Sequence, residues 1–266
     1  MSEPRHAIQT LQLSRTFNGR PALDGLTLEV PAGSFFGFLG PNGAGKSTTI
    51  NILTGLLAPS SGSATVLGYD VSAQSIELKR RIGVVPDGLH LFERLSGEEH
   101  LRFVGEVHDL PPAEARRRAG QLLEAMDLTR DGHKLVASYS HGMRKKLALA
   151  CALIHEPQLL FLDEPFEGVD AIATRELRDL LQRLVAGGRV TVFLTSHVLE
   201  VVERLCTHVG IIAQGRLAAC GTLDELRRGA DGQERSLEDL FLDTVGGTRD
   251  DASAGLDWLT RGDAKP

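Results

Sequence analysis

The sequence predicts an α/β fold with a largely parallel central sheet, and three patterns indicate it. Short apolar segments, typical of strands buried on both faces, occur at residues 35–39, 82–85, 159–162 and 190–194. Helical patterns follow several of these segments, as in a sheet whose strands are connected by crossover helices. Closer to the N-terminus, residues 7–13 and 26–30 alternate apolar and polar side chains, which predicts half-buried strands in an antiparallel β region.

The middle of the chain differs, because residues 96–154 contain no convincing strand. Apolar side chains recur there at helical spacing, at Leu101, Val104, Leu122, Leu123, Met126, Leu147, Cys151 and Ile154. Pro111 and Pro112 can end one helix and start another. We therefore expect a helical subdomain, at about residues 88–155, inserted into one domain that spans residues 1–243. Residues 244–266 are rich in Gly, Asp and Thr, and we expect a mobile tail there.

The composition is that of an ordinary globular protein, with 266 residues of which 42% are hydrophobic. The longest uninterrupted apolar run covers only residues 147–154, whereas a transmembrane helix needs about 20 residues. The first ten residues lack the apolar segment of a secretory signal. We therefore expect neither a membrane span nor a secretory signal.

Charge and cysteine content restrict the function further. The 29 Lys and Arg residues against 35 Asp and Glu give a net charge of −6, so we expect no nucleic-acid partner. Cys151, Cys206 and Cys220 are odd in number and lack CxxC spacing. This pattern predicts unpaired thiols in a reducing compartment.

The strongest chemical signal is a glycine-rich segment that fits the pattern G-x-x-x-x-G-K-[ST]. It follows a predicted strand, precedes a helical pattern, and comprises Gly40, Pro41, Asn42, Gly43, Ala44, Gly45, Lys46, Ser47 and Thr48. Glycines let main-chain N–H groups surround phosphate oxygens, and the helix N-terminus favours negative charge. In such a loop Lys46 neutralises the β- and γ-phosphates, and the Ser47 hydroxyl holds Mg²⁺. The segment predicts a P-loop NTPase core, whereas no G-x-G-x-x-G supports a dinucleotide site.

Two carboxylates, Asp163 and Glu164, follow the apolar segment 159–162. A parallel strand places them at its carboxyl end, where ligands bind in α/β sheets. Asp163 is then a candidate Mg²⁺ ligand, and Glu164 a candidate general base for the attacking water. The alternative is a pair of acids that merely begins a loop, but a phosphate loop in the same sheet favours the catalytic interpretation.

A histidine, His197, closely follows a third apolar segment, residues 190–194. A lone histidine is more often structural or solvated. Its position at the end of a predicted strand nevertheless makes His197 a candidate contact for the γ-phosphate.

A further helix start lies at Ser140, which has the position of an N-cap. With Gly142 in its first turn, such a helix can present N–H groups to an anion. The residues alone favour a simpler interpretation, an amphipathic helix whose basic residues, including Lys145 and Lys146, form a solvated face.

Together, these motifs resemble the ATP-binding subunit of an ABC transporter. Residues 40–48, 140–143, 159–164, Asp170 and His197 occur in that family's order, and the resemblance covers about residues 7–241. It implies that the chain binds ATP and Mg²⁺, with Lys46, Glu164 and His197 as the catalytic residues.

The resemblance also implies two protein partners. A second ATPase subunit, in a homo- or heterodimer, would enclose two ATP molecules head to tail with the first. The signature segment, Ser140, His141, Gly142 and Met143, would contact the ATP bound by the other subunit. Asp170 would lie in the loop that crosses the dimer interface, and the helical subdomain would dock on a separate transmembrane permease. Phe17 would stack on adenine, with core packing as the alternative.

The sequence departs from the family pattern at two places. The signature segment contains His141 and Met143 where the family usually has Gly and Gln, and Asp87 stands where the family usually has Gln. A carboxylate at that position can still bind Mg²⁺, so Asp87 is a candidate ligand beside Ser47 and Asp163.

Both variants, with residues 91–97 and 236–241, are similar to single-domain ATPases of ABC-2-type exporters. This implies an ATP-hydrolysing motor subunit that is cytoplasmic and peripheral on the inner face of the membrane, held there by the permease. The alternative is a soluble non-transport ABC-type ATPase, either an assembly scaffold or a regulatory nucleotide-binding module.

Overall fold

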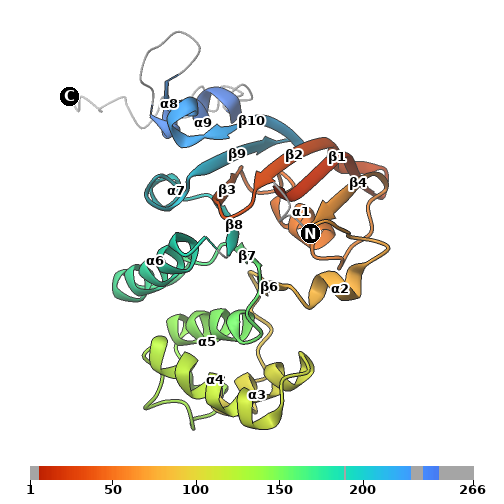
Figure 1. Ribbon diagram of the computed structural model, residues 1–266. Helices are drawn as coiled ribbons and strands as arrows, with labels where there is room; N and C mark the ends of the chain where they lie inside the picture. Colours follow the sequence, from red (N-terminus) through yellow and green to blue (C-terminus); the bar gives the residue numbers. More distant parts are fainter. Residues whose placement is uncertain (1–5, 189, 229–235, 246–266) are drawn as a thin grey trace, which may run out of the picture.

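The computed structural model describes residues 6–188, 190–228 and 236–245, which form two β-sheets and several groups of helices (Figure 1). One sheet is antiparallel and has the strand order β2-β1-β4-β5. Its strands are β1 (His6–Phe17), β2 (Arg20–Pro31), β4 (Ser61–Val66) and β5 (Tyr69–Asp70). The antiparallel β region predicted near the N-terminus is therefore confirmed.

The second sheet is the predicted parallel one, with the order β10-β9-β3-β8-β7-β6. Its strands are β3 (Phe35–Leu39), β6 (Ile82–Val85), β7 (Leu159–Asp163), β8 (Thr191–Ser196), β9 (His208–Ala213) and β10 (Arg216–Thr222). Every neighbouring pair is parallel except β9 and β10. Strands β4, β5, β9 and β10 were not predicted from the sequence.

Side chains of the parallel sheet alternate between two hydrophobic cores. Phe36, Phe161 and Phe193 face the antiparallel sheet and α1 (Lys46–Leu53), and the rings of Phe36 and Phe193 stack with centroids 5.6 Å apart. The residues that alternate with them, such as Leu160 and Leu194, face the helices on the other side. Since successive side chains of a strand point to opposite faces, the continuous apolar segments of the sequence are what a sheet covered on both faces requires.

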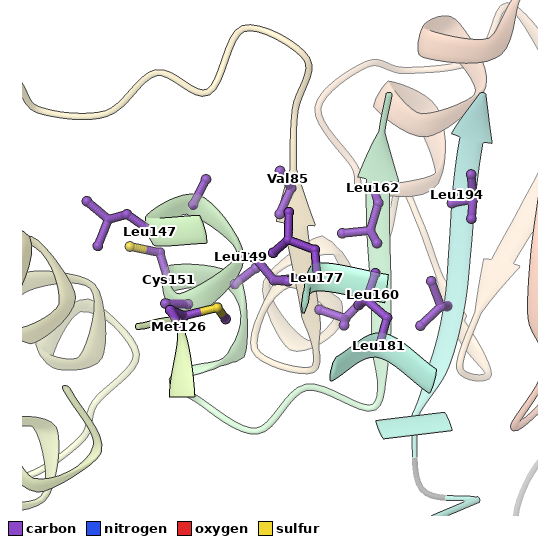
Figure 2. Close-up of a cluster of buried hydrophobic side chains, with 14 of the residues drawn as sticks. Val85, Met126, Leu147, Leu149, Cys151, Leu160, Leu162, Leu177, Leu181 and Leu194 are labelled. Carbon is purple, nitrogen blue, oxygen red and sulfur yellow. The ribbon is translucent and has the colours of Figure 1, made fainter. Parts of the chain in front are cut away.

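The core on the helical side joins the sheet to α5 (His141–Leu153) and α6 (Ala171–Ala186). Figure 2 shows Leu160, Leu162 and Leu194 of the sheet beside Leu149 of α5 and Leu181 of α6. Each of these side chains is at most 5% exposed, and full burial of one leucine contributes about 1.5–3 kcal/mol. This packing holds α5 and α6 against one face of the parallel sheet.

Helices occupy the middle of the chain, as the sequence predicted. Helix α3 (Gly97–Val107) begins with a capping box made by Ser96 and Glu99, and α4 (Pro112–Ala125) begins directly after Pro111. After a short 3₁₀ turn, η1 (Val136–Ser138), Ser140 caps α5 by accepting a hydrogen bond from the N–H of Met143. Helices α3, α4 and α5 gather at the end of the molecule opposite α8 (Leu223–Arg227) and α9 (Leu237–Val245) (Figure 1).

The remaining helices are α2 (Ser75–Lys79), α7 (Leu199–Leu205), α8 (Leu223–Arg227) and α9 (Leu237–Val245). No helix in the part of the chain that the structure describes has the length and apolar character of a membrane span. All three cysteines are free thiols, as predicted. The tail predicted for residues 244–266 lies, from residue 246 on, outside the described residues.

Candidate nucleotide-binding site

Four parallel strands end at one edge of the sheet, and the predicted catalytic residues follow them there. The phosphate loop comes after β3, Asp87 after β6, Glu164 after β7 and His197 after β8. They surround a cleft of about 420 Å³, which is lined by Ala22, Pro41, Asn42, Gly43, Gly45, Lys46, Ser47, Thr48, Asp87, Asp163, Glu164, Glu167 and His197. Segments more than 100 residues apart thus meet at the carboxyl ends of the strands, as expected for a ligand site in an α/β sheet.

The phosphate loop has a backbone that requires glycine at its end. Gly45 has φ +111°, and a Cβ atom there would lie 2.7 Å from the carbonyl oxygen of Ala22. Gly45 is also the N-cap of α1 and offers no side chain to the first-turn N–H groups. Lys46, which is 6% exposed, donates a hydrogen bond of 2.8 Å to the carbonyl oxygen of Gly40. The loop therefore presents N–H groups and one amine to the cleft, an arrangement that suits phosphate.

The carboxylate of Glu164 is shared between two basic side chains. Its Oε1 lies 3.7 Å from Nζ of Lys46, and its Oε2 lies 3.1 Å from Nδ1 of His197. The Glu164 side chain is only 12% exposed, so both contacts lie in a partly desolvated place. Lys46 and His197, both predicted as catalytic, are thus each in contact with Glu164, the third.

The backbone of Glu164 adopts the left-handed conformation, with φ +48°, which is uncommon for a residue with a side chain. Its N–H donates to Oγ1 of Thr195, at 3.2 Å, and its carbonyl oxygen accepts a hydrogen bond of 2.8 Å from Nζ of Lys145. The Thr195 hydroxyl in turn donates to Oδ1 of Asp163 at 2.5 Å. Sequence reasoning assigned no role to Thr195 or Lys145, although Thr195 directly precedes the strand end from which His197 was inferred.

The signature segment lies outside the lining of the cleft but contacts a loop that starts there. Ser140 and His141 are exposed at the N-terminus of α5. Nε2 of His141 lies 3.2 Å from the carbonyl oxygen of Glu167. Farther along α5, Lys145 and Lys146 are only 3% and 8% exposed, so the expectation of a solvated basic face is wrong for both. Lys146 instead pairs with Glu176 of α6, at 2.6 Å.

Asp170 closes the loop that begins at Glu164. Its carboxylate accepts hydrogen bonds of 3.0 Å from the N–H groups of Ile172 and Ala173, and so caps α6. These bonds, the one from Ala173 foremost, lower the pKa of Asp170. A Cβ atom on Gly142 would lie 3.6 Å from Oδ2 of Asp170, so the signature segment and this loop are neighbours within one chain.

Phe17, the predicted adenine platform, lies at the end of β1 and is not part of the cleft lining. Its side chain is 43% exposed, with the guanidinium of Arg15 4.7 Å from the ring centroid. The core-packing alternative is therefore wrong, and contact with adenine stays a prediction.

The oxygen donors around the cleft fit Mg²⁺ and not a softer metal. Ser47, Asp87 and Asp163 all line it, and Mg²⁺ prefers hydroxyl, carboxylate and phosphate oxygens. Among the described residues, no group of three or more His, Cys, Asp or Glu side chains could hold a metal ion by itself. A cation at this place would thus share its coordination with a bound phosphate and water.

Fold and site together define a P-loop nucleotide-binding protein. The sequence profile of the ABC transporter family matches residues 23–167. A solved structure of the ATP-binding subunit of an ABC transporter superposes with a TM-score of 0.83 at 33% identity, covering 90% of this chain and 99% of that one.

Several curated relatives carry names that describe resistance. The daunorubicin/doxorubicin resistance ATP-binding protein DrrA of Streptomyces peucetius is 41% identical over 85% of this chain and 68% of its own length. The linearmycin resistance ATP-binding protein LnrL of Bacillus subtilis is 37% identical over 82% of this chain and 70% of its own length. The chain belongs to the ABC transporter family and is an ATP-binding subunit with the ATPase fold of that family.

Proposed function

We propose that the chain is the motor subunit of an ABC-2-type exporter, in which binding and hydrolysis of Mg-ATP drive a separate membrane subunit. The observation that carries this proposal is the contact of Lys46, Glu164 and His197 at the end of a P-loop cleft. A general base beside a phosphate-binding amine supports a hydrolytic role, which a purely regulatory nucleotide-binding module would not need.

The polar groups of the phosphate loop and of the other strand ends have distinct tasks in this proposal. Main-chain N–H groups of residues 42, 43 and 45–48 and the amine of Lys46 hold the β- and γ-phosphates and offset their charge. The Glu164 carboxylate accepts a proton from the attacking water, and His197, 3.1 Å from that carboxylate, orients it and contacts the γ-phosphate. Ser47 and Asp163, with Asp87 beside them, hold Mg²⁺, which supplies charge neutralisation and orientation of the phosphates.

The active unit in this proposal is a dimer with two ATP molecules at its interface. Ser140 and His141, at the start of α5, are exposed and outside the cleft of their own chain, which supports a role toward ATP bound by a second subunit. The helix N-terminus and Ser140 hydroxyl would then meet the γ-phosphate from the side opposite Lys46. ATP thereby becomes the contact that closes the two subunits, and its hydrolysis reopens them.

The membrane partner is a permease that docks on the helical subdomain at residues 88–155. Through it, the chain would be peripheral on the cytoplasmic face, where ATP is available. The resistance names of DrrA and LnrL support export of an antibiotic-like compound as the transported class. The permease would determine which compound is carried.

Replacement of Glu164 by Gln tests the hydrolytic assignment. The amide keeps the shape of the side chain but cannot take the proton, so steady-state ATPase activity should fall by about 10²–10⁴. ATP affinity, measured with a fluorescent ATP analogue, should stay within about threefold. ATP should also hold the variant as a dimer in size-exclusion chromatography. Undiminished hydrolysis in Glu164→Gln would reject the proposed base.

Purification from membranes tests the transport assignment. Tagged wild-type chain should co-purify with a polytopic membrane protein encoded in the same cell, and detergent-solubilised complex should hydrolyse ATP faster than the isolated chain. Recovery of the chain only from the soluble fraction, without any membrane protein, would favour the non-transport ABC-type ATPase instead.

A further inference from the structure

Lys145 on α5 carries a buried amine that has no role in the proposed function. Its residue is 3% exposed, and Nζ donates a hydrogen bond of 2.8 Å to the main-chain carbonyl oxygen of Glu164. Leu149, Leu162 and Phe166 are its apolar neighbours around a small cavity. A lysine is almost never this buried without a partner, so the bond to Glu164 is what makes the position tolerable.

Several carboxylates of the cleft interact with this amine through their negative charge. Burial lowers the pKa of Lys145, while Asp87, Glu167, Glu164 and Asp163 act in the opposite direction and favour its charged form. The direct hydrogen bond goes to a main-chain carbonyl, however, so it fixes the backbone of Glu164 and leaves its carboxylate free for the cleft.

The backbone of Glu164 needs such support. Its φ of +48° lies in a region that costs a non-glycine residue on the order of 1–3 kcal/mol unless the surroundings hold it. Thr195 binds its N–H, and its carbonyl oxygen accepts a hydrogen bond of 2.8 Å from Lys145 beside a longer one of 3.3 Å from the N–H of Glu167, so both main-chain groups are held from outside their own strand. With the backbone fixed, the carboxylate reaches His197 at 3.1 Å.

Helix α5 holds the next residues of the same loop as well. His141, one turn before Lys145, contacts the carbonyl oxygen of Glu167 at 3.2 Å. The two side chains lie four positions apart and therefore on one face of the helix. The helix that begins with the signature segment thus binds both ends of the segment that begins with the proposed base.

We propose that Lys145 is a positioning residue for ATP hydrolysis, which holds the Glu164 backbone from the signature helix so that the carboxylate faces the cleft. This inference rests on the proposed role of Glu164 as general base. It adds that the position of the base depends on α5, the helix whose first turn is proposed to face the ATP of the other subunit.

The test compares Lys145→Met with Lys145→Gln. Methionine fills the volume but cannot donate, so kcat for ATP should fall about tenfold while KM changes less than twofold. Glutamine retains an N–H donor and should keep at least a third of the wild-type kcat. Lys146→Met is the matched control, because Lys146 is the next residue, is similarly buried, and pairs with Glu176 away from the cleft.

Thermal unfolding and binding of a fluorescent ATP analogue show whether each variant is folded. A folded Lys145→Met with wild-type kcat would overturn the inference, as would equal losses in the methionine and glutamine variants. If the methionine variant does not fold, the glutamine variant is compared with Lys146→Met. A kcat for Lys145→Gln below a third of the kcat for Lys146→Met would then overturn the inference. Activity that persists in Glu164→Gln would reject the proposed base itself, whereas an inactive Glu164→Gln beside a fully active Lys145→Met rejects only the positioning role.

Discussion

Two helices in this molecule begin at proposed phosphate contacts, and they begin in opposite ways. Helix α1 starts at Gly45 with no side-chain cap and lies at the floor of the cleft. Helix α5 starts at Ser140, whose hydroxyl accepts a hydrogen bond of 3.2 Å from Met143, and its first residues are exposed. We propose that phosphate bound in the same chain completes the uncapped start of α1, whereas the start of α5, where Ser140 already accepts a hydrogen bond from the N–H of Met143, faces a second chain.

The difference between the two helix starts predicts that ATP binding and ATP hydrolysis depend on different parts of the molecule. A site built around α1 can bind ATP in a single chain, because Lys46, Ser47 and the loop N–H groups all belong to it. A site that also needs the start of α5 is complete only when two chains meet. We therefore expect substitutions at α1 to affect ATP affinity, and substitutions at α5 to affect hydrolysis with little change in the affinity of one chain.

The largest effect is expected from Gly45→Ala. The added methyl would lie 2.7 Å from both the Ala22 carbonyl oxygen and Cδ2 of Leu23, at a φ of +111° that alanine avoids. ATP affinity should fall by more than about 100-fold, which corresponds to about 2.7 kcal/mol. Titration with a fluorescent ATP analogue measures it.

Gly68→Ala is the matched control for the backbone strain alone. Gly68 has φ +80°, but nothing lies within 4 Å of the added methyl, and the residue is outside the cleft. This variant should unfold more easily yet bind ATP with wild-type affinity. Equal ATP affinities for Gly45→Ala and wild type would mean that the loop does not hold phosphate as described.

Ser140→Ala should have an effect of intermediate size, and it should lower hydrolysis instead of ATP affinity. Loss of the cap should lower the free energy of unfolding by about 1 kcal/mol. Steady-state hydrolysis should fall on the order of tenfold, because one proposed donor to the γ-phosphate is removed. ATP affinity of the isolated chain should change less than twofold, and ATP-dependent dimerisation in size-exclusion chromatography should weaken.

Ser96→Ala separates the loss of a cap from the loss of a phosphate contact. Ser96 caps α3 with the same 3.2 Å bond from a first-turn N–H, so its removal should destabilise the chain similarly and leave hydrolysis unchanged. A Ser140→Ala variant that loses stability but hydrolyses ATP as fast as Ser96→Ala would make Ser140 a structural cap only.

The two helix starts also differ in how far the sequence predicts them. The whole phosphate loop is contiguous, so its residues, its strand and its helix could be recognised from one short segment. The start of α5 was predicted as a capped helix for the same local reason. The burial of Lys145 was not, because its partner Glu164 is 19 residues away and the amine is covered by other elements.

The predicted strands show the same limit. The apolar segments of β3, β6 and β7 were found with bounds correct to within one residue, and β8 ends two residues later than predicted. Strand β4 was missed because it is made of Ser, Gly, Ala, Thr and Val and is recognised by its pairing with β1 and β5. Strand β9 has the same apolar pattern as β7, with Val209, Gly210, Ile211 and Ile212 inside. It could therefore have been predicted as a buried strand from that pattern, as β7 was.

The smallest effect is expected from Asp87→Gln, because Asp87 lies between the two regions, the cleft around α1 and helix α5. Asp87 lines the cleft and also favours the charged form of Lys145 on α5. Glutamine keeps an oxygen donor toward the cleft and removes one negative charge near the γ-phosphate, while Asp163, Glu164 and Glu167 still surround the amine. We therefore expect kcat within about threefold of wild type in steady-state assays at saturating Mg²⁺.

A collapse of hydrolysis in Asp87→Gln with unchanged ATP affinity would show that the carboxylate itself is required. Measuring kcat against Mg²⁺ concentration would then show whether the carboxylate acts on the metal. A higher Mg²⁺ demand would place Asp87 on the metal, whereas an unchanged demand would place it with Lys145.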